Sequence, residues 1–423
     1  MGEEVKKSRP APDPNSAKFK LGQIAAKAYS DAIEAKARGE MVGWCASNFP
    51  VEIPETLGLY VCYPENQAAA IAARGGGERM CNISEGEGYS NDICAYARTS
   101  LAYMKVKDAP EQNMPLPDFV LCCNNICNCM TKWYENIARM CNVPLIMIDI
   151  PYNNTVEVHD SNVKYVRAQF DKAIKQLEEL TGKKFDEKKF EKACENANHT
   201  AKAWLKVCDY LQYKPAPYSG FDLFNHMADV VTARARVEAA EAFELLASDL
   251  EETIKKGETT TPFPEKYRVM FEGIPCWPKL PALFKPLKEH GVNVTAVVYA
   301  PAFGFVYNNM DEMARAYYKA PNSVCIEQGV DWREGICRDN KVDGVLVHYN
   351  RSCKPWSGYM AEMQRRFTKD LGVPTAGFDG DQADPRNFNA AQYETRVQGL
   401  VEAMEANICL LYTSDAADDR ISV

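Results

Sequence analysis

The chain has 423 residues, a formal net charge of −9, 46% hydrophobic residues and 25% charged residues. This length suits two or three domains with a large core, and the acidic balance argues against a nucleic-acid partner, because phosphate binding needs a basic face. No apolar run reaches the roughly 18 residues that cross a bilayer, so we expect no membrane segment.

The N-terminus is polar and contains prolines, which predicts a disordered leader over residues 1–19 and not a signal peptide. Without an export signal we expect a cytoplasmic protein whose thiols stay reduced. Disulfides are therefore the least favoured role for its 16 cysteines. Residues 19–40 then predict an amphipathic helix that ends near Gly39.

Strand and helix patterns alternate over residues 20–159, which predicts an N-terminal α/β domain. We expect the second strand to end in a loop at PENQ, and residues 67–90 to combine a helix with a glycine-rich connection. The alternation of strand and helix patterns stops over residues 160–262. Three long helical patterns take its place, and they predict a helical segment packed on or between α/β domains. The four expected strands are buried segments near residues 41–46, 59–63, 118–123 and 143–150.

The alternating pattern returns over residues 263–407 and matches the first half in order. A strand that ends at Gly43 corresponds to one that ends at Gly273, and DFVLCCNNIC corresponds to DGVLVHYNRSC. We therefore predict an α/β fold with two doubly wound, Rossmann- or flavodoxin-like parallel sheets and a helical insert. Ligands bind beyond the carboxyl ends of such strands. The matched Cys127 and Cys353 both lie there, each just before a helix.

Residues 408–423 form a separate case. The stretch CLLYTSDAADD resembles a translated sequencing-library adapter attached to a truncated reading frame, and it shows neither helical nor strand periodicity. We expect the preceding helical pattern to end with residues 389–406, and we exclude the tail, with Cys409, from functional reasoning.

The cysteines could be packing residues, zinc ligands or cluster ligands. No C-x-x-C pair occurs, so a zinc ribbon or a ferredoxin-like run is not supported, and any cluster must use cysteines distant in sequence. Cys94, Cys127 and Cys353 are well placed at helix starts, where the positive helix end favours a thiolate. A zinc site with three cysteines stays open, and His348 is the one histidine near them in sequence.

Other reactive residues have plainer explanations. One of Cys122 and Cys123 should face the core, and Cys129 is assigned to packing. The loop FDGDQADP carries Asp379, Asp381 and Asp384, for which a turn network is favoured over a metal site. Strand and helix periodicity predicts packing roles for Cys62, Cys81, Cys194, Cys208, Cys325 and Cys337.

Taken together, the motifs resemble those of the α subunit of 2-hydroxyacyl-CoA dehydratases. The resemblance covers roughly residues 20–407, with motifs from both halves in order. AFGFVYNNMDEM and NRSCKPWSG resemble most the members that act on phenyllactoyl-CoA in amino-acid-fermenting anaerobes. The other motifs are GWCASNFP (43–50), YPENQAA (63–69), ICAYAR (93–98), LCCNNICN (121–128), WYENIA (133–138), GFDLFNHMA (220–228), EGIPCWP (272–278) and FDGDQADPR (378–386).

The resemblance implies a 4Fe–4S cluster held by Cys94, Cys127 and Cys353, with a fourth iron position open to water or the substrate. It places Ser47 and Glu65 at the polar active-site positions near the open iron. It implies that an electron added to the thioester carbonyl gives a ketyl radical that loses the 2-hydroxyl, so that water is eliminated and the electron returns. Ordinary ferredoxins, at roughly −400 mV, are too weak for this step.

The resemblance also implies partners: a homologous β subunit with its own cluster, and a separate ATP-hydrolysing iron–sulfur activator. It implies phenyllactoyl-CoA as the leading substrate, with 2-hydroxyisocaproyl-CoA and lactoyl-CoA behind it. Three alternatives stay open: a benzoyl-CoA reductase-type subunit, a relay or scaffold subunit whose cluster has four protein ligands, and a zinc protein.

Overall fold

The computed structural model describes residues 13–418, with side chains described as far as residue 409. It contains two four-stranded sheets in which every strand pair is parallel, in the orders β2-β1-β3-β4 and β6-β5-β7-β8. The two orders are equivalent, so the predicted fold class is confirmed and the two halves repeat one strand order. The predicted match of Gly43 with Gly273 is wrong, because β1 continues to Cys45 and contains Gly43, whereas Gly273 follows β5. The strands are β1 (Val42–Cys45), β2 (Tyr60–Cys62), β3 (Phe119–Cys123), β4 (Leu145–Ile148), β5 (Tyr267–Glu272), β6 (Val292–Val297), β7 (Gly344–Asn350) and β8 (Thr375–Gly380).

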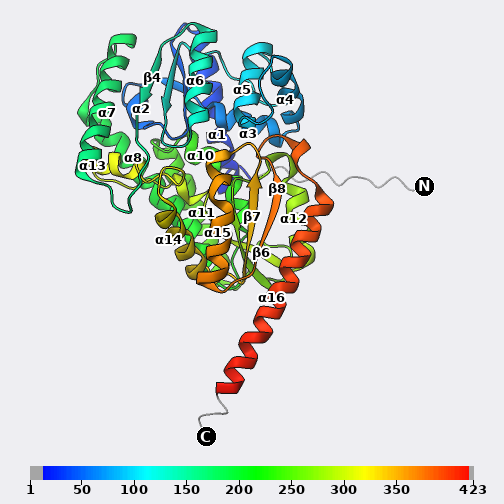
Figure 1. The fold of residues 1–423 in the computed structure, drawn as a ribbon. Coiled ribbons are helices and arrows are strands. Elements are labelled where there is room, and N and C mark those ends of the chain that lie inside the picture. Colours follow the sequence, from blue (N-terminus) through cyan, green and yellow to red (C-terminus); the bar gives the residue numbers. More distant parts are fainter. Residues whose placement is uncertain (1–12, 419–423) are drawn as a thin grey trace.

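Both sheets change direction of winding between their central strands, β1 and β3 in one and β5 and β7 in the other. Loops that leave the carboxyl ends at such a point diverge and leave room for a ligand. Helices cover both faces of each sheet (Figure 1), so the central strands are buried throughout. Cys122 and Cys123 are therefore both buried, where one was expected to face the core.

The N-terminal half departs from the prediction at three places. The first helix begins at Ala17, inside the predicted leader, because Ser16 accepts a hydrogen bond from the Phe19 N–H at 3.2 Å; residues 1–12 lie outside the described part. PENQ opens a helix instead of a loop, with Pro64 at its first position. The glycine-rich stretch mostly forms another helix. The helices are α1 (Ala17–Ala37), α2 (Glu52–Thr56), α3 (Pro64–Ala73), α4 (Gly77–Gly86), α5 (Ala95–Val106) and α6 (Asn128–Cys141).

Between β4 and β5 the chain is helical, as predicted, but the third helical pattern is broken. A capping box of Ser219 and Asp222 starts a short helix, and the chain leaves helical geometry again around Arg234, whose buried side chain reaches other segments. The long helices α8 and α11 pack together. The elements are α7 (Asp160–Thr181), α8 (Glu187–Asp209), η1 (Tyr210–Gln212), α9 (Gly220–Phe224), α10 (Met227–Thr232) and α11 (Val237–Lys255).

The C-terminal half ends in a helix that continues to Asp418 and projects from the body (Figure 1). The expectation of no helix in the tail is therefore wrong for residues 408–418. Alanine and leucine have high helical propensity, so a helix can form without an apolar periodicity in the sequence. The adapter origin of the tail stays a prediction. The elements are η2 (Trp277–Lys279), α12 (Leu280–Glu289), η3 (Pro301–Phe303), α13 (Met310–Tyr317), α14 (Ile326–Asp339), α15 (Lys354–Leu371), η4 (Pro385–Asn387) and α16 (Ala390–Asp418).

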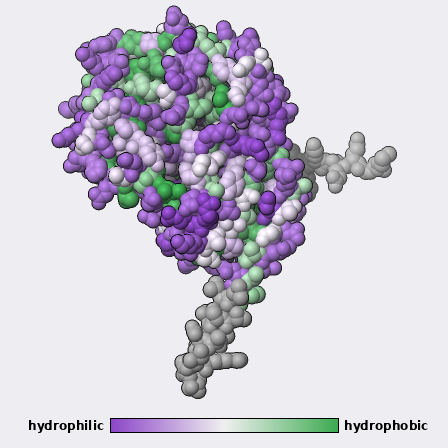
Figure 2. All heavy atoms as spheres, in the orientation of Figure 1, coloured by the Kyte–Doolittle hydropathy of each residue, from purple (hydrophilic) through white to green (hydrophobic). Residues whose placement is uncertain are grey.

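The surface mixes hydrophilic and hydrophobic side chains. On the face drawn in Figure 2 hydrophobic side chains are scattered among hydrophilic ones. Among the residues that the structure describes, no helix combines the length and the apolar character needed to cross a membrane.

Candidate active site

The carboxyl ends of the two sheets share one cavity of about 510 Å³. It is where a ligand is expected between two doubly wound domains. Its lining contains all five residues predicted as site residues, so the structure brings them together from five separate segments. In the first half, Ser47, Glu65 and Cys127 follow β1, β2 and β3 in that order, and Cys94 precedes α5. In the second half, the lining residues that follow β5, β6, β7 and β8 are Trp277, Tyr299, Cys353 and Gln382.

Cys94, Cys127 and Cys353 are each the N-cap residue of a helix, of α5, α6 and α15 respectively. The Met130 N–H, at the start of α6, donates to the Cys127 sulfur at 3.3 Å. Three helix N-termini therefore present sulfur to one cavity, together with N–H groups that can stabilise negative charge on it. The prediction that these cysteines stand at helix starts is confirmed.

The thiols are not activated when no metal is bound. Burial raises the pKa of the Cys127 and Cys353 thiols to about 12. Burial, followed by the charges of Cys129, Cys353 and Cys127, raises the pKa of the Cys94 thiol well above its ordinary value. The expected thiolate stabilisation by helix ends is therefore outweighed by burial and mutual repulsion. Positive iron would reverse this balance, and its binding would release the thiol protons.

Glu65 opens α3 and is buried against the β1 loop. One carboxylate oxygen accepts the Ser47 N–H at 3.1 Å, and the other accepts the Tyr134 hydroxyl at 2.5 Å. Burial raises the pKa of the Glu65 carboxyl, and these two donors partly offset that effect. A buried carboxyl with a raised pKa at a cavity wall is suited to accept and return a proton.

Arg234 holds the loop that carries Ser47. Its guanidinium donates to the carbonyls of Ser47 and Phe49, at 3.1 and 2.8 Å, and lies 3.5 Å from the Glu52 carboxylate. Both charged side chains are almost fully buried. Sequence analysis missed Arg234, because nothing local separates it from the surface arginines of neighbouring helices.

Arg234→Met is expected to lower the free energy of unfolding by about 3 kcal/mol, because it leaves Glu52 buried without its cation. Urea unfolding of the purified chain measures this loss. Arg236→Met is the matched control, since the Arg236–Glu55 pair is partly exposed and should contribute less than about 1 kcal/mol. Equal losses in the two variants would contradict the role of Arg234.

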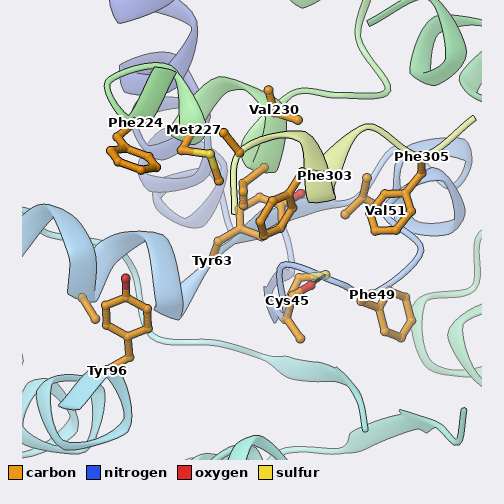
Figure 3. Close-up of a cluster of buried hydrophobic side chains, with 14 of the residues drawn as sticks. Cys45, Phe49, Val51, Tyr63, Tyr96, Phe224, Met227, Val230, Phe303 and Phe305 are labelled. Atoms are coloured by element: carbon orange, nitrogen blue, oxygen red, sulfur yellow. Dashed lines mark hydrogen bonds between the residues drawn. The ribbon is translucent and has the colours of Figure 1, made fainter. Parts of the chain in front are cut away.

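Aromatic and aliphatic side chains form most of the remaining wall. Tyr96, Phe224, Met227 and Phe303, all of which line the cavity, come from separate segments and lie in one apolar cluster (Figure 3). Such a wall excludes water and suits an apolar group beside the polar residues. Phe303 stands in the motif AFGFVYNNMDEM, but its place at the cavity could not be predicted, because apolar periodicity does not separate a cavity wall from a core.

Asp381 and Asp384, after β8, form a turn network, as predicted. Asp379 does not belong to it, because it lies within β8 and faces Arg351 at 3.6 Å. Asp381 accepts the N–H groups of Ala383 and Asp384, at 3.0 and 3.1 Å. Asp384 in turn binds Arg98 and Arg386. These contacts tie the loop to α5, one turn beyond Cys94, so the same loop connects the two halves at the cavity.

A single-ion site finds no support in the part of the chain that the structure describes, where no three His, Cys, Asp or Glu side chains lie close enough to hold one metal ion. His348 is buried beside Cys276, at 3.3 Å, and does not join the three cysteines. A cluster is a different case, because its ligands bind separate irons. Three cysteines at helix N-caps on one cavity fit a cluster with an open iron.

Comparison with known proteins shows the family of the chain. A family model described as 2-hydroxyglutaryl-CoA dehydratase, D-component, matches residues 46–404. The chain is 63% identical to the (R)-2-hydroxyglutaryl-CoA dehydratase α subunit of Acidaminococcus fermentans and 56% identical to the (R)-phenyllactyl-CoA dehydratase α subunit of Clostridium sporogenes, in each case over 92% of this chain and 96% of the relative. Identity to the (R)-2-hydroxyisocaproyl-CoA dehydratase α subunit of Clostridioides difficile is 47%, with the same coverage. The chain therefore belongs to the 2-hydroxyacyl-CoA dehydratases, a family of hydro-lyases, as an α subunit.

Proposed function

We propose that this chain is the cluster-bearing α subunit of an (R)-2-hydroxyacyl-CoA dehydratase that eliminates water to give an (E)-2-enoyl-CoA. The observation that carries the proposal is the convergence of three N-cap cysteines on one apolar cavity. Cys94, Cys127 and Cys353 would hold a 4Fe–4S cluster. When bound, the cluster would supply one electron to the thioester carbonyl and recover it at the end, so that the 2-hydroxyl and a β-proton leave as water without net oxidation or reduction.

The protein's own groups then orient the substrate and handle protons. Ser47 lines the same cavity as the three cysteines, and its backbone carbonyl accepts a hydrogen bond from Arg234. Its hydroxyl would donate a hydrogen bond to the thioester oxygen, where negative charge develops. Glu65 is placed to take the β-proton once loss of the hydroxyl has made it acidic. The aromatic wall keeps water away from the radical.

The cavity favours an apolar acyl group. Its one cationic side chain among the described lining residues is Arg74, at the exposed end of α3 and hydrogen-bonded to Gln112 at 3.0 Å. Arg74 stands nine residues beyond Glu65, about 13 Å along the helix, and already binds Gln112, so the wall that the structure describes around Glu65 itself offers no cation to an acyl carboxylate. A buried carboxylate without a cation is costly. We therefore propose (R)-phenyllactoyl-CoA as the substrate.

A second candidate is (R)-2-hydroxyglutaryl-CoA, favoured by the 63% identity to the relative named for that substrate. Asn48, which lines the cavity, also supports this second substrate. The Asn48 side chain is buried at the cavity, and its amide oxygen has no hydrogen-bond partner. Turned to present its N–H₂ group, such an amide could donate to an acyl carboxylate.

The partners follow from the family. The relatives are named α subunits, and we propose that this chain pairs with a homologous β subunit in the cytoplasm of an amino-acid-fermenting anaerobe. A separate ATP-dependent iron–sulfur activator would deliver the electron.

The experiment combines the anaerobically purified α and β subunits with the activator, ATP and a reductant, and offers the two acyl-CoA substrates in parallel. The proposal predicts cinnamoyl-CoA from (R)-phenyllactoyl-CoA, with kcat/KM at least tenfold above that for (R)-2-hydroxyglutaryl-CoA. The reverse order would move the chain to the second candidate. Reduction of benzoyl-CoA instead of dehydration would contradict both.

A further inference from the structure

Gln382 follows β8 and lies at the cavity, 1% exposed. Its side-chain Nε2 lies 3.2 Å from the Cys94 sulfur. For Cys127 the corresponding donor is a backbone N–H. Among the described residues, Gln382 is the one whose side chain donates a hydrogen bond to any of the three cysteines, so this contact can be changed by substitution without touching the backbone.

The Gln382 amide presents its N–H₂ end to the Cys94 sulfur. The Ser352 Oγ accepts the Ala95 N–H at 3.0 Å, so the hydroxyl hydrogen of Ser352 is free to point elsewhere. It points to the Gln382 Oε1, 3.4 Å away. With Oε1 used as an acceptor, the N–H₂ group is the end presented to Cys94.

Both sides of this contact are held rigidly. The backbone carbonyl of Gln382 accepts the Trp277 N–H at 3.1 Å. The adjacent Asp384 accepts a 2.9 Å hydrogen bond from Arg98, whose side chain is fully buried. Arg98 belongs to α5, the helix that Cys94 caps. A buried ion pair therefore ties the loop that carries the donor to the helix that carries the sulfur.

We propose that Gln382 is a positioning residue that tunes the reduction potential of the cluster through Cys94. The inference rests on the proposed function, since it requires the cluster. An N–H group that donates to a ligand sulfur draws electron density from it and stabilises the more negative, reduced state. The hydrogen bond therefore makes the cluster easier to reduce and eases electron delivery from the activator.

The test is a redox titration of the full chain, purified without oxygen and followed by electron paramagnetic resonance. Gln382→Met keeps the length of the side chain and removes the donor. We expect the equilibrium constant for one-electron reduction of the cluster to fall at least tenfold in this variant. That change corresponds to a reduction potential about 59 mV more negative. Gln382→Glu should shift the potential further in the same direction when ionised, because it adds negative charge near the sulfur.

Asn387→Leu is the matched control, since its amide lies on the same loop and reaches Asp381 at 3.5 Å but no cysteine; its potential should equal that of the wild type. An unchanged potential in Gln382→Met would overturn the inference. Folded Gln382 variants that both lack the cluster would also overturn it, because Gln382 would then serve retention and not tuning. A wild-type chain without a cluster would instead remove the proposed function itself.

Discussion

Cys353→Ala is expected to give a folded chain that no longer retains a 4Fe–4S cluster and has lost more than about 100-fold of its activity, the upper range for losing even an outer partner of a metal site. Cys353 caps α15 in the second half of the chain, while Cys94 and Cys127 come from the first half. Without it, two thiols from one side of the cavity remain. Iron, acid-labile sulfide and the visible absorbance of the cluster measure the loss.

Cys337→Ala is the matched control for this substitution. Cys337 is buried in the second half beside Met270, and its replacement removes a thiol from packing alone. It should keep the cluster and lower only the stability, by about 1 kcal/mol. If Cys353→Ala kept the full cluster content of the wild type, the assignment of the ligands would be wrong.

Glu65→Gln is expected to lower kcat by about 10²- to 10⁴-fold, the range typical of losing a general base. The amide keeps the size of the side chain and an oxygen that can accept from Ser47 or Tyr134, so folding and KM should change little. Steady-state kinetics of the activated complex measure both constants. Glu55→Gln, on α2 and outside the cavity lining, is the control and should leave kcat unchanged.

The pH profile separates a proton-transfer role from a packing role for Glu65. Burial raises the pKa of this carboxyl, so the group becomes protonated at a higher pH than an ordinary glutamate. A base must be unprotonated. The activity of the wild type should therefore decline as the pH falls through this raised pKa, above the usual range of glutamate, and Glu65→Gln should lack that decline. Identical profiles in the two proteins would contradict the role.

The sheets and the positions of the three cysteines at helix starts could be predicted from sequence because their signals are local. A buried parallel strand reads as a continuous apolar run, and the duplicated strand–cysteine–helix order placed Cys127 and Cys353 at equivalent ends. The N-cap positions followed from the same junctions. The burial of the thiols did not follow, since it depends on how the two halves meet, and it outweighs the lowering of the thiol pKa by the N–H groups at the helix ends.

The supporting residues could not be predicted, because their partners are distant in sequence. Arg234 hydrogen-bonds the loop after β1, which is distant from it in sequence. The helix is interrupted around Arg234 because this tertiary contact outweighs local helical propensity. Gln382 and Tyr134 stood within recognised motifs, FDGDQADPR and WYENIA, so an accounting of every polar residue in those motifs would have found them. The C-terminal helix shows the opposite case, because local propensity extends it beyond Met404, its last buried residue among those described.

The account depends most directly on the cluster, and the iron and acid-labile sulfide content of the full chain purified without oxygen tests it. The account predicts the content of one 4Fe–4S cluster per chain, with an electron paramagnetic resonance signal that changes when a 2-hydroxyacyl-CoA is added, because an iron position stays open to the substrate. A folded chain that binds no iron under these conditions would contradict it.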